Sequence, residues 1–187
     1  MSQTRRSGDE PTVLVVEDDR ELADTYSVWL EPEYEVRTAY SGSDGLTWYD
    51  SSVDIVLLDR QIPDLSGMTV IQNMEKRDVN DQKAMLTGLE PGSDLAELPC
   101  DEYLRKPVTK SQLRDAVDEL RVRSDLDDEL QRHFTLTSKI AALKNNDATD
   151  TADTVDALRR EAEQTRARIE DQMSDLDEVR KAYKILE

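Results

Sequence analysis

The run VDIVLLD at Val53–Asp59 is the most strand-like stretch of the sequence. It is almost continuously apolar and shorter than a typical helix, and it ends on an aspartate. A similar run, TVLVVE, lies at Thr12–Glu17 and is rich in β-branched residues. Continuous rather than alternating apolar residues are typical of strands buried on both faces, as in a parallel sheet with helices on each side.

Weaker strands alternate with amphipathic segments along the rest of the first 120 residues. Further strands are expected at Tyr34–Ala39, Lys83–Thr87 and Glu102–Leu104. Helical spacing occurs at Arg20–Leu30, Ser43–Tyr49, Met68–Arg77 and from about Lys110, whereas Asp94–Leu98 has room for one or two turns. Repeated strand–helix units predict an α/β fold, with helices on both faces of a parallel sheet and function at the carboxyl ends of the strands.

Polar side chains follow the expected strands in an order that predicts a common site. The first strand leads to Glu17 and Asp18, the third to Asp59, the fourth to Thr87 and the fifth to Lys106. Carboxylates at such short distances repel one another, so we expect a cation to bind among them. Because the ligands offered are oxygens, without His or Cys, the expected cation is Mg²⁺. A carboxylate can also attack phosphorus to form an aspartyl phosphate. Mg²⁺ and Lys106 would then neutralise the phosphoryl oxygens, and Thr87 would donate a hydrogen bond to them.

Each of these residues also has an ordinary alternative role. An acidic run after a strand is usually a helix cap or a solvated turn, and a terminal aspartate such as Asp59 is usually a turn residue. A lysine before a proline is usually a surface residue. The combination on successive strand ends, in this order, favours a phosphoryl-accepting site over these alternatives.

The motifs resemble those of response-regulator receiver domains across about Thr12–Leu120. The matching motifs are VVEDD at Val15–Asp19, Asp59-x-x-x-Pro63-x-x-x-Gly67, Thr87, and Tyr103-x-x-Lys106-Pro107. The resemblance implies a flavodoxin-like, doubly wound, five-stranded parallel sheet. It also implies that Asp59 accepts a phosphoryl group from a histidine kinase.

The same resemblance assigns roles to the other motif residues. It implies that Glu17, Asp18, Asp59 and the backbone carbonyl of Gln61 bind Mg²⁺. It makes Thr87 and Tyr103 a switch pair and Lys106 the ion-pair partner of the phosphoryl group, with a cis Lys106-Pro107 bond. One departure is the short segment from Thr87 to Lys106, which holds Pro91 and Pro99 and predicts a stunted fourth helix.

The sequence changes character after Leu120, where Gly and Pro no longer occur. Apolar and small residues follow a three-four alternation that predicts a coiled-coil seam, and Asn145–Asp147 is a turn signal. The seam comprises Val155, Leu158, Ala162, Thr165, Ile169, Gln172, Leu176, Val179, Tyr183 and Leu186. We expect an antiparallel helical hairpin whose first helix continues the one from Lys110. Two roles stay open for this hairpin. It packs only on itself, or it binds a partner, which includes a second copy of the chain.

The tail resembles the HalX-type helical domain that follows receivers in halophilic archaea. The signals are FTLTSKIAAL at residues 134–143, the charged hairpin and the acidic composition. The expected organisation is a disordered lead-in at residues 1–10, a receiver domain at 11–120 and a helical hairpin domain at 121–187.

Composition limits the function classes. The chain has 24 basic and 42 acidic residues, a net charge of -18, which is unlike a general nucleic-acid binder and favours a salt-loving source. The single Cys100 cannot form an internal disulfide. No apolar run approaches the ~18 residues needed to span a bilayer, and the polar N-terminus lacks a signal-peptide core, so we expect a cytoplasmic protein with no membrane partner.

These features leave three candidate functions. The leading one is a response regulator that signals through its helical tail, with a homodimer through the C-terminal helices as one candidate readout. A DNA-binding transcriptional regulator acting through the tail is the alternative, although the tail is net acidic. A magnesium-dependent phosphohydrolase of the aspartyl-phosphate type would need an acid two residues after Asp59, where Gln61 stands. We therefore expect no enzyme activity beyond slow self-dephosphorylation.

Overall fold

The computed structural model describes most of the chain. Described are residues 10–77, 79, 81–89, 92–124, 126, 128–144 and 151–184, with only the helix backbone described for residues 172–184. The expected lead-in, apart from Glu10, and the expected turn at Asn145–Asp147 lie outside these residues.

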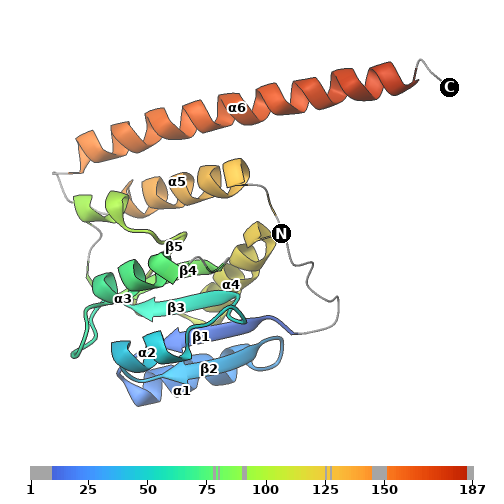
Figure 1. Cartoon of the computed structure of the whole chain (residues 1–187). Helices are drawn as coiled ribbons and strands as arrows, with labels where there is room; N and C mark the ends of the chain where they lie inside the picture. Colours follow the sequence, from blue (N-terminus) through green and yellow to red (C-terminus); the bar gives the residue numbers. More distant parts are fainter. Residues whose placement is uncertain are drawn as a thin grey trace.

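Five parallel strands form one sheet in the order β2-β1-β3-β4-β5 (Figure 1). In the register, Val13 of β1 lies opposite Val36 of β2 and Ile55 of β3. The strands are β1 (Thr12–Val16), β2 (Glu35–Ala39), β3 (Ile55–Asp59), β4 (Gln82–Thr87) and β5 (Glu102–Arg105). The predicted doubly wound parallel sheet is confirmed.

Helices cover both faces of this sheet because its central strands are apolar on both sides. One core cluster joins Val13, Val15 and Ile55 to α1 and α4, and the other joins Leu14, Val16 and Val56 to α2 and α3. The elements of this region are α1 (Arg20–Leu30), α2 (Gly42–Trp48), α3 (Gly67–Met74), η1 (Glu75–Arg77), η2 (Ser93–Glu97) and α4 (Lys110–Ser124). The expected stunted fourth helix is confirmed, since η2 is a five-residue 3-10 helix.

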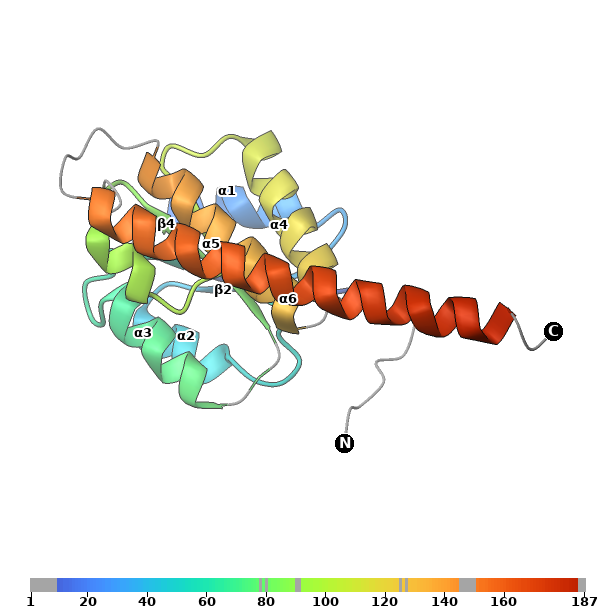
Figure 2. The same cartoon turned by 90° about the horizontal axis from the view of Figure 1, so that it is seen from above.

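The chain after α4 forms an antiparallel helical hairpin of α5 (Asp128–Lys144) and α6 (Ala152–Lys184). The ion pairs Arg132–Glu161 and Arg168–Glu129 join the two helices. The predicted seam is confirmed from Val155 to Thr165, where Val155, Leu158, Ala162 and Thr165 are buried, whereas the next seam residue, Ile169, is half-buried. Because α6 has 33 residues and α5 has 17, α6 extends well past the rest of the fold (Figures 1 and 2). Among the described residues, no helix is apolar enough over sufficient length to cross a membrane.

The expectation that the first tail helix continues the helix from Lys110 is wrong. Helix α4 ends at Ser124 and α5 begins at Asp128. The run Ser-Asp-Leu-Asp-Asp at residues 124–128 is rich in side chains that favour caps and turns over helix interiors. The buried Arg123 also bonds to the carbonyl oxygen of Asp101 (3.2 Å) and pairs with Glu102 (3.1 Å). The break therefore brings α5 back alongside β5.

Gly67, the first residue of α3, lies against the turn that follows β3. Its N–H donates to the carbonyl oxygen of Arg60 at 3.0 Å. A Cβ atom at position 67 would lie 2.3 Å from the carbonyl oxygen of Asp59 and 2.7 Å from the Cα of Arg60. Only glycine therefore lets the start of α3 approach the end of β3 this closely.

We predict that Gly67→Ala lowers the free energy of unfolding by about 1–3 kcal/mol, because the added methyl group forces backbone atoms apart. Gly88→Ala is the matched control, since nothing lies within 4 Å of a Cβ atom built there. Denaturant unfolding of both variants at equal salt measures the difference. Equal stability of the two variants would contradict the close approach.

Candidate functional site

Three carboxylates meet at the carboxyl edge of the sheet, as the strand ends predicted. Glu17 and Asp18 directly follow β1, and Asp59 is the last residue of β3. One carboxylate oxygen from each of the three lies within 4.8 Å of the other two. Glu17 and Asp59 are buried, whereas Asp18 is exposed. The cluster is therefore open to solvent on the side of Asp18.

Lys106 reaches the same cluster from the end of β5. Its Nζ donates to Oε2 of Glu17 at 2.5 Å and to Oδ2 of Asp59 at 2.7 Å. Its backbone N–H donates to the carbonyl oxygen of Thr87 at 2.8 Å, and the Lys106-Pro107 bond is cis, as the family resemblance implied. The other carboxylate oxygen of Asp59, Oδ1, accepts the N–H of Gln61 at 2.9 Å. The ammonium group thus bridges the two buried carboxylates.

The charges of this cluster are not balanced. Burial raises the pKa of Glu17 to about 7, an effect that the hydrogen bond from Lys106 opposes and the charge of Asp59 reinforces. Burial alone would lower the pKa of Lys106, but its bonds to Asp59 and Glu17 outweigh this and raise it. Two buried carboxylates and the exposed Asp18 share one ammonium group. This all-oxygen donor set with excess negative charge fits a hard divalent cation such as Mg²⁺.

Thr87 and Tyr103 lie next to each other beside this cluster. The N–H of Leu89 donates to Oγ1 of Thr87 at 3.0 Å, and the hydroxyl of Tyr103 donates to the carbonyl oxygen of Leu89 at 3.3 Å. Burial raises the pKa of Tyr103, while hydrogen bonding to Arg60 and Thr87 opposes the rise. The backbone of Leu89 thus connects the two residues, and this connection had no signal in the sequence.

An ion pair between Arg60 and Asp94 was also missed by the sequence analysis. It joins the residue after Asp59 to η2, which lies in the stunted region between β4 and β5. Arg60 is a variable position of the Asp59-x-x-x-Pro63 motif and Asp94 lies outside the motifs, so no sequence motif signals this pair. The structure thus brings together Glu17, Asp18, Asp59, Thr87, Tyr103 and Lys106, and adds Arg60, Leu89 and Asp94 around them.

Comparisons with known proteins agree with this geometry. Residues 13–118 match the response regulator receiver domain family, and residues 122–184 match the HalX domain family. A putative transcriptional regulator of Haloferax volcanii is 37% identical over an alignment of 187 positions. This alignment covers 95% of this chain and 32% of that protein. The chain spans less than two thirds of the length of the curated relatives it matches.

Solved receiver domains share the fold. The CheY-like receiver domain of Methanospirillum hungatei has a TM-score of 0.58 and 25% identity, covering 63% of this chain and 98% of that structure. The response regulator TrrA of Thermotoga maritima, solved in complex with Mg²⁺ and BeF, has a TM-score of 0.53 and 29% identity. That match covers 59% of this chain and 98% of TrrA.

We predict that Glu17→Gln stabilises the protein at pH 8 when divalent cations are chelated. In the folded state the raised pKa keeps a proton on Glu17 up to about pH 7, whereas the ordinary pKa of this carboxyl is 4.5. The stability that this proton contributes is therefore complete below pH 4.5 and is lost as the pH rises to about 7. Removing the charge should recover roughly 1–3 kcal/mol, since one pKa unit corresponds to about 1.4 kcal/mol. Thermal melts at pH 5 and pH 8 measure the gain, and a variant that gains nothing at pH 8 would contradict the prediction.

Proposed function

Because the chain belongs to the response regulator family, with a receiver domain followed by a HalX domain, we propose that it accepts a phosphoryl group on Asp59 from a histidine kinase and signals through its C-terminal helices. One observation carries the proposal. The carboxylate of Asp59 lies beside Glu17 and Asp18 and is held by the ammonium group of Lys106. An attacking carboxylate thus has a positive charge and a set of oxygen ligands within reach.

The proposed roles of the side chains follow from their positions. Asp59 is the nucleophile: one carboxylate oxygen bonds to phosphorus while the bond between phosphorus and the histidine nitrogen of the kinase breaks and the histidine leaves. Lys106 shifts from the carboxylates to pair with a phosphoryl oxygen. Thr87 donates its hydroxyl hydrogen to a second oxygen. Glu17, Asp18, Asp59 and the backbone carbonyl of Gln61 would hold Mg²⁺, which supplies charge neutralisation when bound. Residues 11–120 form the proposed receiver unit and residues 121–187 the output unit.

The proposed output is an interaction made by the hairpin, including a homodimer. Helix α6 continues past the first turn of α5, where Arg168 pairs with Glu129, and the seam predicted from the sequence continues along it through Leu176, Val179 and Tyr183. A predicted seam that is longer than its partner helix in the hairpin is suited to packing against α6 of a second copy of the chain. Since a histidine kinase draws its phosphoryl group from ATP, the proposal includes a cytoplasmic location.

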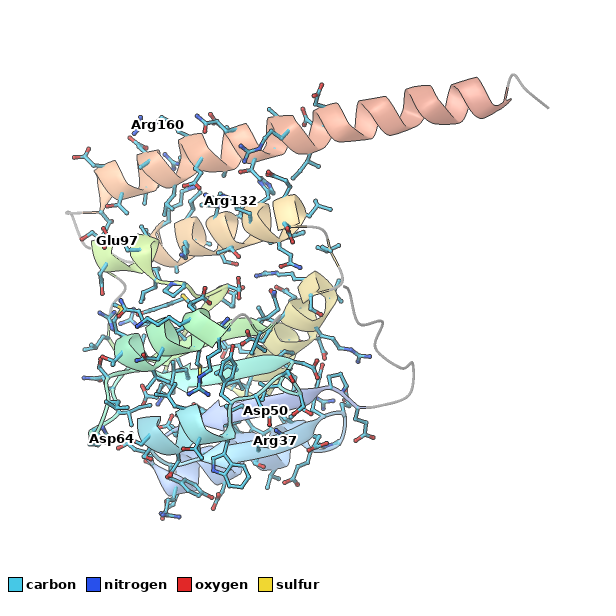
Figure 3. The ribbon with its side chains drawn as sticks, viewed as in Figure 1. Arg37, Asp50, Asp64, Glu97, Arg132 and Arg160 are labelled. Carbon is cyan, nitrogen blue, oxygen red and sulfur yellow. The ribbon has the colours of Figure 1, made fainter. Side chains whose placement is uncertain are left out.

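A DNA-binding regulator is the second candidate, favoured by the description of the Haloferax volcanii relative. The charges of the hairpin argue against direct binding. Arg132 pairs with Glu161 across the hairpin, and Arg159 and Arg166 pair with acids on their own helix. Figure 3 shows Arg132 on α5 and Arg160 on α6. Arginines that are already paired contribute little to phosphate binding. A shift of duplex DNA that persists at high salt would favour this candidate instead.

We predict that acetyl phosphate with magnesium adds one phosphoryl group to the wild-type chain at high salt. Asp59→Asn should abolish the adduct, because an amide oxygen is a poor nucleophile toward phosphorus. Intact-mass analysis measures the adduct. The matched control is Asp44→Asn, which removes an exposed acid on α2 and should leave the adduct unchanged.

Chelation of magnesium should also abolish the adduct. An adduct that forms equally in Asp59→Asn would overturn the assignment of the acceptor. A folded wild-type chain that forms no adduct, either from acetyl phosphate or from a phosphorylated histidine kinase of the same organism, would overturn the proposed function.

We further predict a solution mass near twice 21.3 kDa for the full chain at high salt, because the seam predicted for the 33-residue α6 is longer than the 17-residue α5 can cover. Sedimentation equilibrium measures this mass. The mass of a single chain across micromolar concentrations, with and without acetyl phosphate and magnesium, would contradict dimerisation through the hairpin.

A further inference from the structure

Helix α5 covers the first half of the seam on α6. The seam residues from Val155 to Thr165 are buried, whereas Ile169 is half-buried. At this point Arg168 pairs with Glu129, the second residue of α5. The part of α6 that follows projects from the rest of the fold (Figure 2). The seam predicted after Ile169 therefore lies beyond the start of α5.

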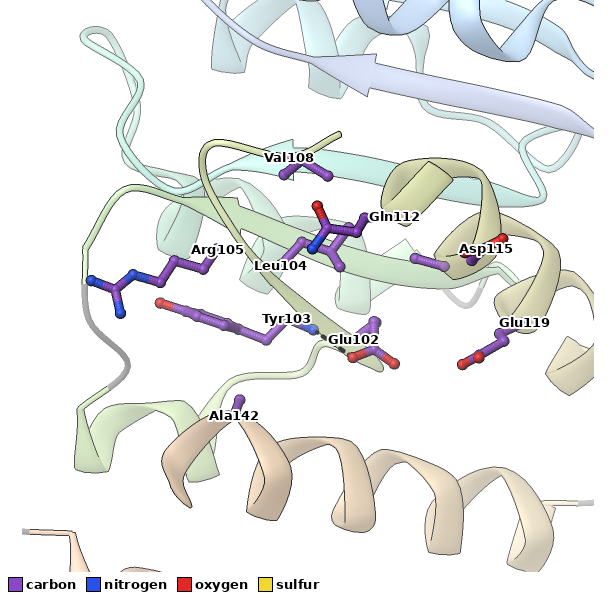
Figure 4. Close-up of a pocket in the computed structure, with 10 residues that line it drawn as sticks. Glu102, Tyr103, Leu104, Arg105, Val108, Gln112, Asp115, Glu119 and Ala142 are labelled. Carbon is purple, nitrogen blue, oxygen red and sulfur yellow. Dashed lines mark hydrogen bonds between the residues drawn. The ribbon is translucent and has the colours of Figure 1, made fainter. Parts of the chain in front are cut away.

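Contacts on two sides set the position of α5. Besides its ion pairs with α6, Oγ1 of Thr135 donates to Asp101 at 2.9 Å, and Oγ of Ser138 donates to Glu102 at 2.8 Å. Figure 4 shows Ala142 of α5 at a cavity of about 410 Å³ that is also lined by β5 and α4. Because α5 lies between the sheet and α6, another helix can reach the seam face of α6 only beyond α5.

This cover decides in which direction α6 of a second copy can pair with α6 of the first. Since α6 is one continuous helix, two parallel seams that face each other beyond α5 also face each other beside α5. The two α5 helices would then have to share the space between them. In an antiparallel pair, the second α6 meets the first beyond α5 and runs in the same direction as α5. It would continue the line of α5 along the seam.

The charges beyond α5 favour the same direction. Residues 170–178 include five acidic and no basic residues, and residues 180–184 include three basic and no acidic residues. A parallel pair brings like charges level with each other, whereas an antiparallel pair brings the acidic segment of each helix level with the basic segment of the other. Salt screens charges at a surface, so the space taken by α5 is the stronger of the two constraints.

We propose that α6 of a second copy pairs antiparallel with α6 beyond Arg168, so that the two receiver domains lie at opposite ends of the dimer. Seam positions match when Gln172 is level with Tyr183 of the second copy and Leu176 is level with Val179. The polar residue of this stretch of seam thus comes level with a residue whose hydroxyl can share a hydrogen bond with an amide. The inference rests on the proposed homodimer and names its arrangement.

Disulfide cross-linking tests the direction of pairing in the full chain. In a Cys100→Ala background, chains with Gln172→Cys and chains with Tyr183→Cys are mixed at high salt and oxidised. Cross-links should form only in the mixture, because the two copies of residue 172 lie roughly 16 Å apart along the axis of an antiparallel pair. Ser174→Cys lies on the side of α6 away from the seam and is the matched control, which should not cross-link to Tyr183→Cys.

A distance measurement checks the arrangement without a covalent bond. Glu163 is exposed on the part of α6 beside α5. Spin labels on Glu163→Cys, again with Cys100→Ala, should lie roughly 45 Å apart in the antiparallel dimer by double electron–electron resonance. A parallel pair would bring the same labels within about 20 Å of each other, because paired helices lie side by side.

The outcomes separate this inference from the proposals on which it builds. A cross-link in Gln172→Cys alone, or a short distance between the labels, would overturn the antiparallel arrangement. A dimeric mass without a cross-link in the mixture would also overturn it, while the proposed homodimer would stand. The mass of a single chain would overturn the homodimer and this inference together, and the phosphoryl adduct on Asp59 is measured independently of both.

Discussion

The repulsion between the buried carboxylates of Glu17 and Asp59 is the constraint on which the rest of the site depends. Parallel pairing of β1 with β3 brings these two residues to the same sheet edge, so the fold itself creates the repulsion. Lys106 compensates part of it, and the cis bond to Pro107 follows directly after Lys106. Gly67 allows the turn after Asp59 to close beneath α3. The remaining negative charge suits a divalent cation, and a bound cation would in turn offset the charge of a phosphoryl group on Asp59.

Much of the receiver-like region was predictable because its signals are local. Continuous apolar runs such as Val53–Asp59 specify buried strands, and parallel strands bring Glu17, Asp59 and Lys106 to one edge whatever the loops do. The prolines on either side of η2 likewise predicted a shortened helix. The seam of α6 was visible because its three-four alternation extends over many turns.

The position of α5 was not predictable, because periodicity identifies an apolar stripe without naming the surface that it covers. The same spacing of Leu136, Ile140 and Leu143 suits a helix packed on α6 or one packed on β5, and in the structure it serves both. The break before Asp128 depends on the contacts of Arg123 with Asp101 and Glu102, which lie about 20 residues earlier in the chain. Long-range polar contacts of this kind leave no trace in local sequence patterns.

The unequal lengths of α5 and α6 give the hairpin the geometry of a lever. Helix α6 has 33 residues and a rise of about 1.5 Å per residue, so it is roughly 50 Å long, whereas its ion pairs with α5 lie in its first half, up to Arg168. A tilt of only about 10° about the first residues of α6 would move the far tip of the helix by roughly 9 Å. A displacement near β5 that is too small to change the sheet would thus become a movement as wide as a helix at the far end of the molecule.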